Sequence, residues 1–267
     1  MTPSPGGEVL HDALARLYDV DLLEDPGDLD LYLALAARTG GPVVELAVGS
    51  GRIAVPIAAS GVDVVGVDTD PAMLARARRR ADAAEAGASG RLELVEADLV
   101  GLRHPGAGTF RLAILALNSL LLLGTRSAQR DAIATMAGLL CPGGVAVVDV
   151  WLPDAEDLAR FDGRLMLEYL RTDRETGLEV TKTAAAWHDH ASGRVTLSTV
   201  YEEAEPGGMP RRWTRMDLLR LVGADELVAF AEDAELVVET LAGDHDLRAI
   251  GPASDRAILV AVRPPRA

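Results

Sequence analysis

The feature that most constrains the fold is a series of short apolar, β-branched segments that alternate with helix-like segments between residues 41 and 151. Strands that are apolar on both faces and separated by helices are typical of a parallel sheet covered on both sides. This pattern therefore predicts a doubly wound α/β core. We expect strands over 42–48, 62–68, 91–97, 110–117 and 144–151, and helices over 52–59, 71–86 and 127–140.

Two other kinds of segment flank this core. Apolar spacing of helical type over 8–17 and 28–38 predicts an N-terminal helical cap, and Asp28 and Asp30 suit the start of its second helix. After Trp151 we expect successive strands with no helix among them, which would form an antiparallel sheet with one covered face. These strands are expected over 164–172, 177–189, 194–203 and 211–221.

The C-terminal segment returns to the core with a helix at 224–234 and strands at 236–241 and 256–262. The link between these two strands has no helical pattern, so the last strand should run antiparallel to its neighbour. The expected fold class is thus α/β, a Rossmann-like doubly wound sheet of seven strands with an antiparallel last strand. We assign the whole chain to a single domain with a helical cap (1–39), a core (40–151 and 223–263) and an inserted antiparallel β lid (160–222).

Composition and charge exclude several classes of function. A chain of 267 residues that is 49% hydrophobic can bury a full core. Its formal charge of −15 opposes nucleic-acid binding, which draws on Lys and Arg contacts to phosphates. No apolar run is long enough to span a membrane, and no leader is apparent, so we expect a cytoplasmic protein without membrane contact. Cys141 is the single cysteine, and no metal site is expected.

The segment between the first strand and the next helix contains a glycine pair. Gly49 and Gly51 begin the run GSGRIA, which matches G-x-G-x-x-G/A, and Asp68 ends the next strand 17 residues after Gly51. Taken alone, this motif permits a nicotinamide dinucleotide. An NAD(P)-dependent reductase is therefore one alternative.

Three carboxylates favour a different ligand. Glu45 lies in the first strand, Asp68 ends the second, and Asp98 follows the third, so all three should face the crevice at the carboxyl ends of the strands. A pyrophosphate would be repelled there, because it binds backbone N–H groups. An ammonium, a ribose diol and an adenine amine would each donate to a carboxylate. S-adenosylmethionine carries all three and no phosphate.

Several ordered motifs resemble the class I S-adenosylmethionine-dependent methyltransferases, and more closely their small-molecule branch. The similar stretches are VVELAVGSGR, VVGVDTDPAMLARAR, LVEADL and GLLCPGGVAVVDVW, together with Tyr18-Asp19 and Asp30-Leu31-Tyr32 upstream and GDHD and PASDRAILVAV at the end. The resemblance covers nearly the whole chain. It departs from the family at Ala47, where many members have glycine.

The resemblance implies S-adenosylmethionine as the cofactor and S-adenosylhomocysteine as its product. It places Glu45, Gly49 and Gly51 at the methionine end and Asp68 on the ribose hydroxyls. Met73 would pack on the adenine, whose edge Asp98 and the Leu99 backbone would read. The full set of expected cofactor residues is Tyr18, Glu45, Ala47, Gly49, Gly51, Arg52, Asp68, Thr69, Met73, Asp98, Leu99 and Asn118.

Methyl transfer to a free amine needs in-line placement and exclusion of water, whereas a hydroxyl acceptor adds a general base. Asn118 follows the fourth strand, Tyr18 matches the family's cap tyrosine, and His188 alternates with His190 in the lid. Tyr18, Asn118 and His188 are the candidate catalytic residues. A metal at His188 and His190 is disfavoured, because too few ligands surround them.

The leading hypothesis is methyl transfer to nitrogen or oxygen of a small-molecule acceptor. The lid sheet is expected to form the acceptor pocket or a contact in a homodimer. Besides the reductase, the alternatives are a non-catalytic cofactor-binding module with this fold and, weakest, a nucleic-acid methyltransferase.

Overall fold

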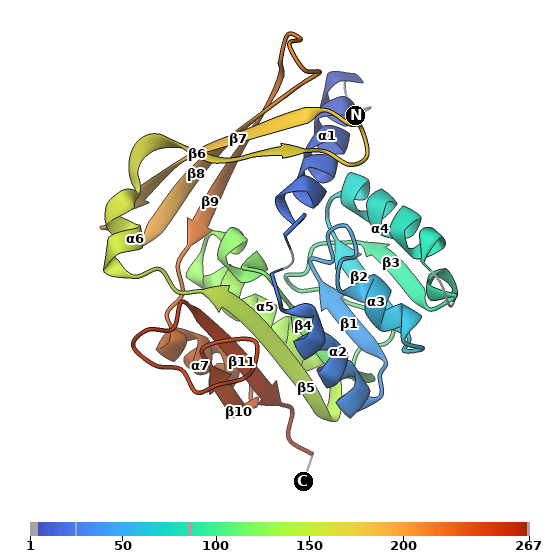
Figure 1. The fold of residues 1–267 in the computed structure, drawn as a ribbon. Coiled ribbons are helices and arrows are strands. Elements are labelled where there is room, and N and C mark those ends of the chain that lie inside the picture. Colours follow the sequence, from blue (N-terminus) through green and yellow to red (C-terminus); the bar gives the residue numbers. More distant parts are fainter. Residues whose placement is uncertain (1–4, 25, 85–86, 266–267) are drawn as a thin grey trace. The chain divides into compact units, whose positions relative to one another are not determined.

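The computed structural model describes residues 5–24, 26–84 and 87–265 and divides the chain into two compact units. Unit 1 joins Met1–Pro26 to Pro153–Leu221, and unit 2 joins Gly27–Leu152 to Val222–Ala267 (Figure 1). Among the described residues, no helix combines the length and the apolar character that crossing a lipid bilayer requires.

Unit 2 is built on a seven-stranded sheet with the order β10-β11-β5-β4-β1-β2-β3 among its described residues. Neighbouring strands are parallel except at β11, which runs antiparallel to both β5 and β10. The predicted sheet and its antiparallel last strand are therefore confirmed. The strands are β1 (Val43–Leu46), β2 (Val64–Asp68), β3 (Leu92–Glu96), β4 (Phe110–Leu115), β5 (Leu140–Trp151), β10 (Val237–Ala242) and β11 (Arg256–Val262).

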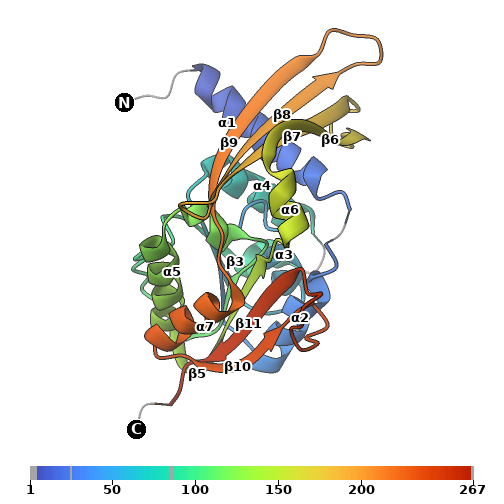
Figure 2. The same ribbon diagram turned by 90° about the vertical axis from the view of Figure 1, so that its left-hand side faces the viewer.

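Helices cover both faces of this sheet. Helices α2, α3 and α4 lie on one face and α5 and α7 on the other (Figure 2). Such double cover explains why the strands are apolar on both sides. The helical segments of unit 2 are α2 (Leu29–Thr39), α3 (Ala54–Ala59), α4 (Pro71–Ala83), α5 (Arg126–Leu139) and α7 (Ala224–Asp233), with the 3₁₀ turns η1 (Ala88–Gly90) and η2 (Ser119–Leu123).

The sheet face toward α2 and α3 is apolar over most of its length and charged at one end. Val43 of β1 and Val147 of β5 lie in the core on this face. Side chains alternate along a strand, so Glu45 and Asp149, each two residues further on, point to the same face. Arg256 begins β11 two residues before the core residue Ile258 and shares that face as well. The carboxyl-end rim of the sheet thus brings buried charged groups together.

Unit 1 contains a four-stranded antiparallel sheet with the order β6-β7-β8-β9. Its strands are β6 (Asp162–Thr172), β7 (Glu179–Asp189), β8 (Arg194–Ala204) and β9 (Arg211–Arg220), and its helices are α1 (Pro5–Asp21) and α6 (Ala155–Arg160). The expected alternation in β8 is present, since Val195, Thr199 and Tyr201 are buried.

Helix α1 covers one face of this antiparallel sheet. Leu17 and Val20 pack against Val180 and Tyr201. Asp21 at the end of α1 accepts hydrogen bonds from the hydroxyls of Tyr201 at 2.7 Å and Tyr169 at 2.6 Å. These contacts raise the pKa of both tyrosines, chiefly through burial. The N-terminal helix is therefore fixed to the sheet by apolar and polar contacts together.

A second polar contact anchors the middle of α1. The Arg16 guanidinium forms ion pairs with the carboxylates of Asp173 and Glu203, both of which are buried. The other oxygen of Glu203 accepts a hydrogen bond from the Trp213 indole at 3.0 Å. The segment 1–39, expected as one cap, is thus divided in the structure, because α1 belongs to unit 1 and α2 to unit 2.

The structure corrects three local expectations. A helix, α6, does follow Trp151, and Asp154 begins it with a complete capping box. Strand β5 begins at Leu140, four residues before the expected start at 144, so it includes the Cys-Pro-Gly-Gly run that follows the end of α5. Asp28 precedes α2, but its carboxylate does not cap the helix; it binds Arg52 instead. Residues 85 and 86 of the helix expected over 71–86 lie outside the described residues.

We predict that Ala47→Gly stabilises the protein. Ala47 has a φ of 57°, a left-handed conformation that costs a residue with a Cβ about 1–2 kcal/mol. Glycine removes that cost but gains entropy in the unfolded chain, so the expected net gain is up to about 1 kcal/mol, or roughly 2–4 °C in Tm. Thermal unfolding of the ligand-free protein followed by circular dichroism measures it.

Ala75→Gly is the matched control. Ala75 is exposed within α4, where glycine lacks any conformational advantage and should destabilise by about 1 kcal/mol. A decrease in Tm for Ala47→Gly as large as that for Ala75→Gly would contradict the assigned conformation.

Candidate functional site

The loop between β1 and α3 has an unusual backbone that its glycines permit. Gly49 and Gly51 have φ values of 53° and 78°, and Ala47 shares this left-handed region. A Cβ at Gly51 would lie 3.0 Å from both the Ala77 Cβ and a Val55 methyl group, so the loop also lies close to α4. Glycine is needed here for both conformation and space.

Asp68 at the end of β2 is held directly against this loop. The Gly49 N–H donates to one carboxylate oxygen at 2.8 Å, and the Asp70 N–H donates to the other at 3.0 Å. Both oxygens keep lone pairs for a further donor, since a carboxylate accepts about four hydrogen bonds. Asp68 is therefore oriented in advance to accept hydrogen bonds from a ligand over the loop.

Glu45 lies beneath the loop and is the most perturbed carboxyl group of the rim. It is 4% exposed, and its Oε2 has no hydrogen-bond partner. Burial raises the pKa of Glu45 to about 8, although the nearby Arg52 guanidinium and a hydrogen bond from the Ala54 N–H oppose this rise. The carboxyl group is thus protonated at neutral pH while no cation approaches it.

The other expected adenine-side residues follow β2 and β3. Asp98 is exposed and accepts a hydrogen bond from the Val100 N–H at 2.8 Å, which leaves its second oxygen for a donor. Leu99 is buried, Met73 is half-buried in α4, and Thr69 is exposed directly after β2. Parallel pairing of Asp68 with Glu96 brings these two strand ends to the same edge.

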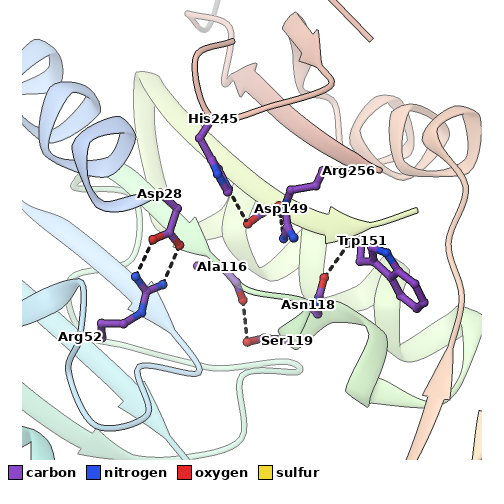
Figure 3. Close-up of polar contacts among 9 residues, drawn as sticks. All are labelled: Asp28, Arg52, Ala116, Asn118, Ser119, Asp149, Trp151, His245 and Arg256. Carbon is purple, nitrogen blue, oxygen red and sulfur yellow. Dashed lines mark hydrogen bonds and ion pairs between the residues drawn. The ribbon is translucent and has the colours of Figure 1, made fainter. Parts of the chain in front are cut away.

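Two ion pairs with buried carboxylates lie at the same rim, Asp28 with Arg52 and Asp149 with Arg256 (Figure 3). Asp28, fully buried before α2, accepts two hydrogen bonds from the Arg52 guanidinium at 2.5 and 2.6 Å. Asp149 of β5 is also fully buried, and its Oδ1 accepts from Arg256 Nε at 2.8 Å. The second Asp149 oxygen lies 3.3 Å from His245 Nε2. These contacts link four segments that are far apart in the sequence.

Two carboxylates and one imidazole of this network lie close enough together to be considered as metal ligands. Ligand atoms of Asp28, Asp149 and His245 all lie within 4.8 Å of one another. Each carboxylate is already neutralised by a guanidinium, however, so a divalent cation would add to two positive charges. The arrangement therefore suits an ion-pair network better than a metal site.

Tyr32 of α2 is the remaining buried polar group on this face. Its hydroxyl is fully buried and has no hydrogen-bond partner. Burial, and then the charges of Asp149 and Asp28, raise the pKa of this hydroxyl. Tyr32 and Glu45 are thus two unpartnered polar groups beside one network, and unpartnered buried groups of this kind are rare away from binding sites.

Asn118 connects the ends of β4 and β5. Its backbone N–H donates to the Asp149 carbonyl at 3.1 Å, and its side-chain oxygen accepts from the Trp151 N–H at 2.6 Å (Figure 3). Asn118 precedes the η2 turn with a φ of 66°, and its side chain does not cap that turn. The side-chain oxygen of Asn118 therefore joins the ends of β4 and β5.

Two of the expected catalytic residues belong to unit 1. Tyr18 is half-buried in α1. The ring of His188 in β7 and that of His190 in the following turn meet edge to face with centroids 4.4 Å apart, and the His188 Nδ1 is buried without a partner. Their roles in catalysis stay predictions.

The sequence reasoning missed most of the ion-pair network. It did not identify the Asp28 to Arg52 pair, the role of Asp149 or the role of Arg256. One signal was present: Asp149 is the only charged residue in the apolar run VAVVDV, as Glu45 is in VVELAV. A carboxylate at that place in a doubly covered strand must be buried near the strand end.

The chemistry of the rim fits S-adenosylmethionine. Glu45 offers an unpartnered oxygen to an ammonium, and Asp68 offers lone pairs to a diol. These acceptors would oppose a phosphate at the loop. The fit thus rests on an acceptor-rich surface formed before any ligand binds.

Comparisons with known proteins show which domain and fold this chain resembles. Residues 43–144 match a family model described as a methyltransferase domain. The CcbJ methyltransferase of Streptomyces caelestis is 26% identical over 89% of this chain and 96% of its own, with a TM-score of 0.74. A comparison with curated proteins gave no match.

Two further solved structures share the fold at lower identity. The sugar N-methyltransferase KedS8 of a Streptoalloteichus species is 21% identical over 93% of this chain and 91% of its own, with a TM-score of 0.71. CalS10, an amino pentose methyltransferase of Micromonospora echinaspora with S-adenosylmethionine bound, is 20% identical over 98% of both chains, with a TM-score of 0.64. The chain thus matches a methyltransferase domain over residues 43–144 and, over most of its length, shares its fold with S-adenosylmethionine-dependent methyltransferases.

Proposed function

We propose that this chain transfers a methyl group to the nitrogen of a small-molecule amine, with oxygen of a hydroxyl group as the alternative acceptor. The observation that carries the proposal is Glu45, a buried carboxyl group with an unpartnered oxygen beneath the glycine loop and beside the oriented Asp68. This pair suits the ammonium and the ribose of the cofactor.

The residues of unit 2 would hold the cofactor in a defined order. Glu45, Ala47, Gly49, Gly51 and Arg52 would surround its methionine end. Asp68 and Thr69 would contact the ribose, and Met73, Asp98 and Leu99 the adenine. When bound, the cofactor supplies a methyl group on a positively charged sulfur, which departs as a neutral sulfide. The chain's own contribution is then to position the acceptor and to exclude water.

Nitrogen is the favoured acceptor atom because of two structural relatives. KedS8 is named a sugar N-methyltransferase, and CalS10 is named an amino pentose methyltransferase. An amine also needs less from the protein than a hydroxyl group, since a free amine already has a reactive lone pair. Amino sugars and simple amines are therefore the first acceptors to test.

We predict that Asp68→Ala weakens binding of S-adenosylhomocysteine at least tenfold in calorimetry, because the ribose loses its acceptor. Wild-type protein should bind the ligand and release S-adenosylhomocysteine when supplied with S-adenosylmethionine and a panel of amino sugars and amines. Circular dichroism should show an intact fold in the variant.

Asp63→Ala is the matched control, since Asp63 precedes β2 at the opposite edge and forms only an exposed pair with Arg91. Its affinity for the ligand should equal that of the wild type. Equal binding by Asp68→Ala would refute the placement of the cofactor. Tight NAD(P) binding by the wild type would favour a reductase, and cofactor binding without turnover on the whole panel would favour a non-catalytic module.

Glu45 gives a prediction about pH. Its pKa rises from 4.5 in the unfolded chain to about 8 in the folded protein, so the folded state binds the extra proton between these values. The free energy of unfolding of the ligand-free protein should therefore fall as the pH rises from 5 to 8. Glu45→Gln, which cannot ionise, should lack this component in urea unfolding at each pH.

The same carboxyl group should lose its proton when the cofactor's ammonium binds. Calorimetry of S-adenosylhomocysteine binding at pH 7 in two buffers of different ionisation enthalpy should report proton release in the wild type. Glu45→Gln should show less release. Identical proton release in the two proteins would remove Glu45 as the group that meets the ammonium.

We also propose that the chain pairs with a second copy through unit 1. One face of the antiparallel sheet is covered by α1, while the opposite face carries a group of exposed apolar side chains, and such groups mark interaction surfaces. A sheet face of this kind can pack against its own copy about a two-fold axis. The register of the strands places on that face Leu165, Leu167, Leu170, Trp187, Met216 and Leu218.

We predict that Leu167→Glu and Met216→Glu convert a dimer into a monomer of 28.1 kDa in light scattering, because each buries a charge in the proposed contact. Val237→Glu is the control, since Val237 is equally exposed but lies on β10 of unit 2. The proposal would be wrong if the wild-type protein were monomeric at micromolar concentration, or if only the Val237→Glu control dissociated the dimer.

A further inference from the structure

We propose that His245, oriented by Asp149 and Arg256, accepts the proton that an ammonium acceptor must lose before its nitrogen can be methylated. The inference rests on the proposed transfer to nitrogen. A primary amine is mostly protonated at neutral pH, and an ammonium has no lone pair with which to attack a methyl group. A group near the acceptor therefore has to take a proton in every turnover.

The hydrogen bonds around Asp149 define the state of the imidazole. Asp149 is fully buried, and Arg256 occupies its Oδ1 through Nε at 2.8 Å. Its Oδ2 faces His245 Nε2 at 3.3 Å. A carboxylate oxygen only accepts, so Nε2 carries the hydrogen and Nδ1 is the basic nitrogen. Asp149 and Arg256 are thus positioning residues, and His245 Nδ1 is the proton acceptor.

Asp149 and His245, here called the dyad, lie at the rim that holds the other site residues. Asp149 points to the same sheet face as Glu45, near the carboxyl end of β5. The Asn118 N–H donates to the Asp149 carbonyl, which joins the dyad to the end of β4. In open α/β sheets this part of the rim, beside the point where the strand order reverses between β1 and β4, is where ligands bind.

Charged groups surround the imidazole from every neighbouring element. Asp28 before α2 lies within 4.8 Å of the dyad and is paired with Arg52 from the start of α3. Tyr32 of α2 and Glu45 of β1 lie on the same face, and both are uncharged at neutral pH. In the loop of His245 itself, Asp244 and Asp246 both pair with Arg248.

These groups make a protonated His245 electrostatically acceptable. The two carboxylates Asp28 and Asp149 balance the two guanidiniums Arg52 and Arg256, so the network is neutral while the imidazole is neutral. When the imidazole gains a proton, Asp149 faces it directly and stabilises the added charge. His104 lacks an equally close and buried partner among the described residues. The carboxylate that faces it belongs to the mostly exposed Glu93 and lies 4.0 Å away.

The proton balance is simple. One N–H bond of the acceptor's ammonium breaks, and its electron pair stays on nitrogen as the lone pair that methylation requires. The proton bonds to His245 Nδ1 and yields an imidazolium. The His245 side chain is 16% exposed, so this proton can later leave to solvent and restore the neutral imidazole. The net reaction releases one proton and needs no further reactant.

The first test measures the imidazole directly and needs no acceptor. In the full chain with S-adenosylhomocysteine bound, ¹H–¹⁵N NMR of labelled histidine should show neutral His245 as the Nε2–H tautomer, with its signals assigned by their loss in His245→Gln. Asp149→Asn should lower the share of this tautomer, because the facing carboxylate is gone. A neutral His245 that carries its hydrogen on Nδ1 overturns the proposal.

The second test uses whichever amine of the panel is methylated. His245→Gln should lower kcat/KM by about 10²-fold at pH 7 and recover toward the wild type at pH 9 to 10, where the amine deprotonates without help. Its affinity for S-adenosylhomocysteine should stay within twofold of the wild type. Loss of activity that is equal at all pH values would mark His245 as structural and overturn the proposal.

Asp246→Asn is the control for this loop. Asp246 is next to His245, but its side chain is 70% exposed and pairs with Arg248. Its kcat/KM and its pH profile should match the wild type. Absence of turnover on every amine would count against the proposed function, whereas the NMR measurement of the tautomer would still decide the state of His245.

Discussion

Two buried guanidinium–carboxylate pairs hold the rim of unit 2 on which the site depends. Removing charged groups from water costs several kcal/mol per ion, and only close, well-oriented partners offset this cost. Arg52 with Asp28 and Arg256 with Asp149 meet this condition. Loss of one partner would leave a buried charge, with an expected cost of about 3–5 kcal/mol. The pairs therefore fix the start of α2, the glycine loop, the end of β5 and the start of β11 in one arrangement.

The network also decides what a ligand meets at the rim. Arg52 and Arg256 bind Asp28 and Asp149 directly, whereas the buried Glu45 keeps one carboxyl oxygen without a hydrogen-bond partner. Desolvation then keeps Glu45 protonated until a positively charged group arrives. Asp68, by contrast, is held by two backbone N–H groups and needs no partner to stay oriented. The same rim thus has two kinds of carboxyl group. Glu45 changes its protonation when the ligand binds, whereas the orientation of Asp68 is fixed beforehand.

Much of the fold could be predicted because hydrophobic periodicity is a local property. The alternation of apolar runs and helical segments correctly predicted the parallel sheet, and the absence of a helix before 256–262 correctly predicted an antiparallel last strand. Short-range rules failed where two of them competed. Strand β5 was predicted to begin at residue 144, yet it begins at Leu140, directly after the end of α5. Helix α6 was missed because the strand pattern after Trp151 outweighed the capping signal at Asp154.

Individual site residues also divide into those that local patterns predicted and those that they did not. The positions of Glu45, Asp68 and Asp98 at three strand ends follow from strand length alone, so the sequence identified them. The partner of Asp28 did not follow from local rules, because its place before a helix favoured a cap, whereas an arginine 24 residues away takes its carboxylate. Asn118 was predicted to contact a ligand because it follows the fourth strand, but its hydrogen bond from the Trp151 N–H joins residues 33 apart and did not follow from local rules.

By itself, the sequence determined the sheet, the glycine loop and the carboxylates that favour a cationic, phosphate-free cofactor. These features depend on periodicity, glycine positions and residue type, all of which are written along the chain. Only the tertiary structure decided which charges meet. Arg256 reaches Asp149 across 107 residues, and His245 reaches the same carboxylate from another loop, because β11 inserts between β10 and β5. Pairing of this kind depends on strand order and side-chain direction, and no local pattern records it.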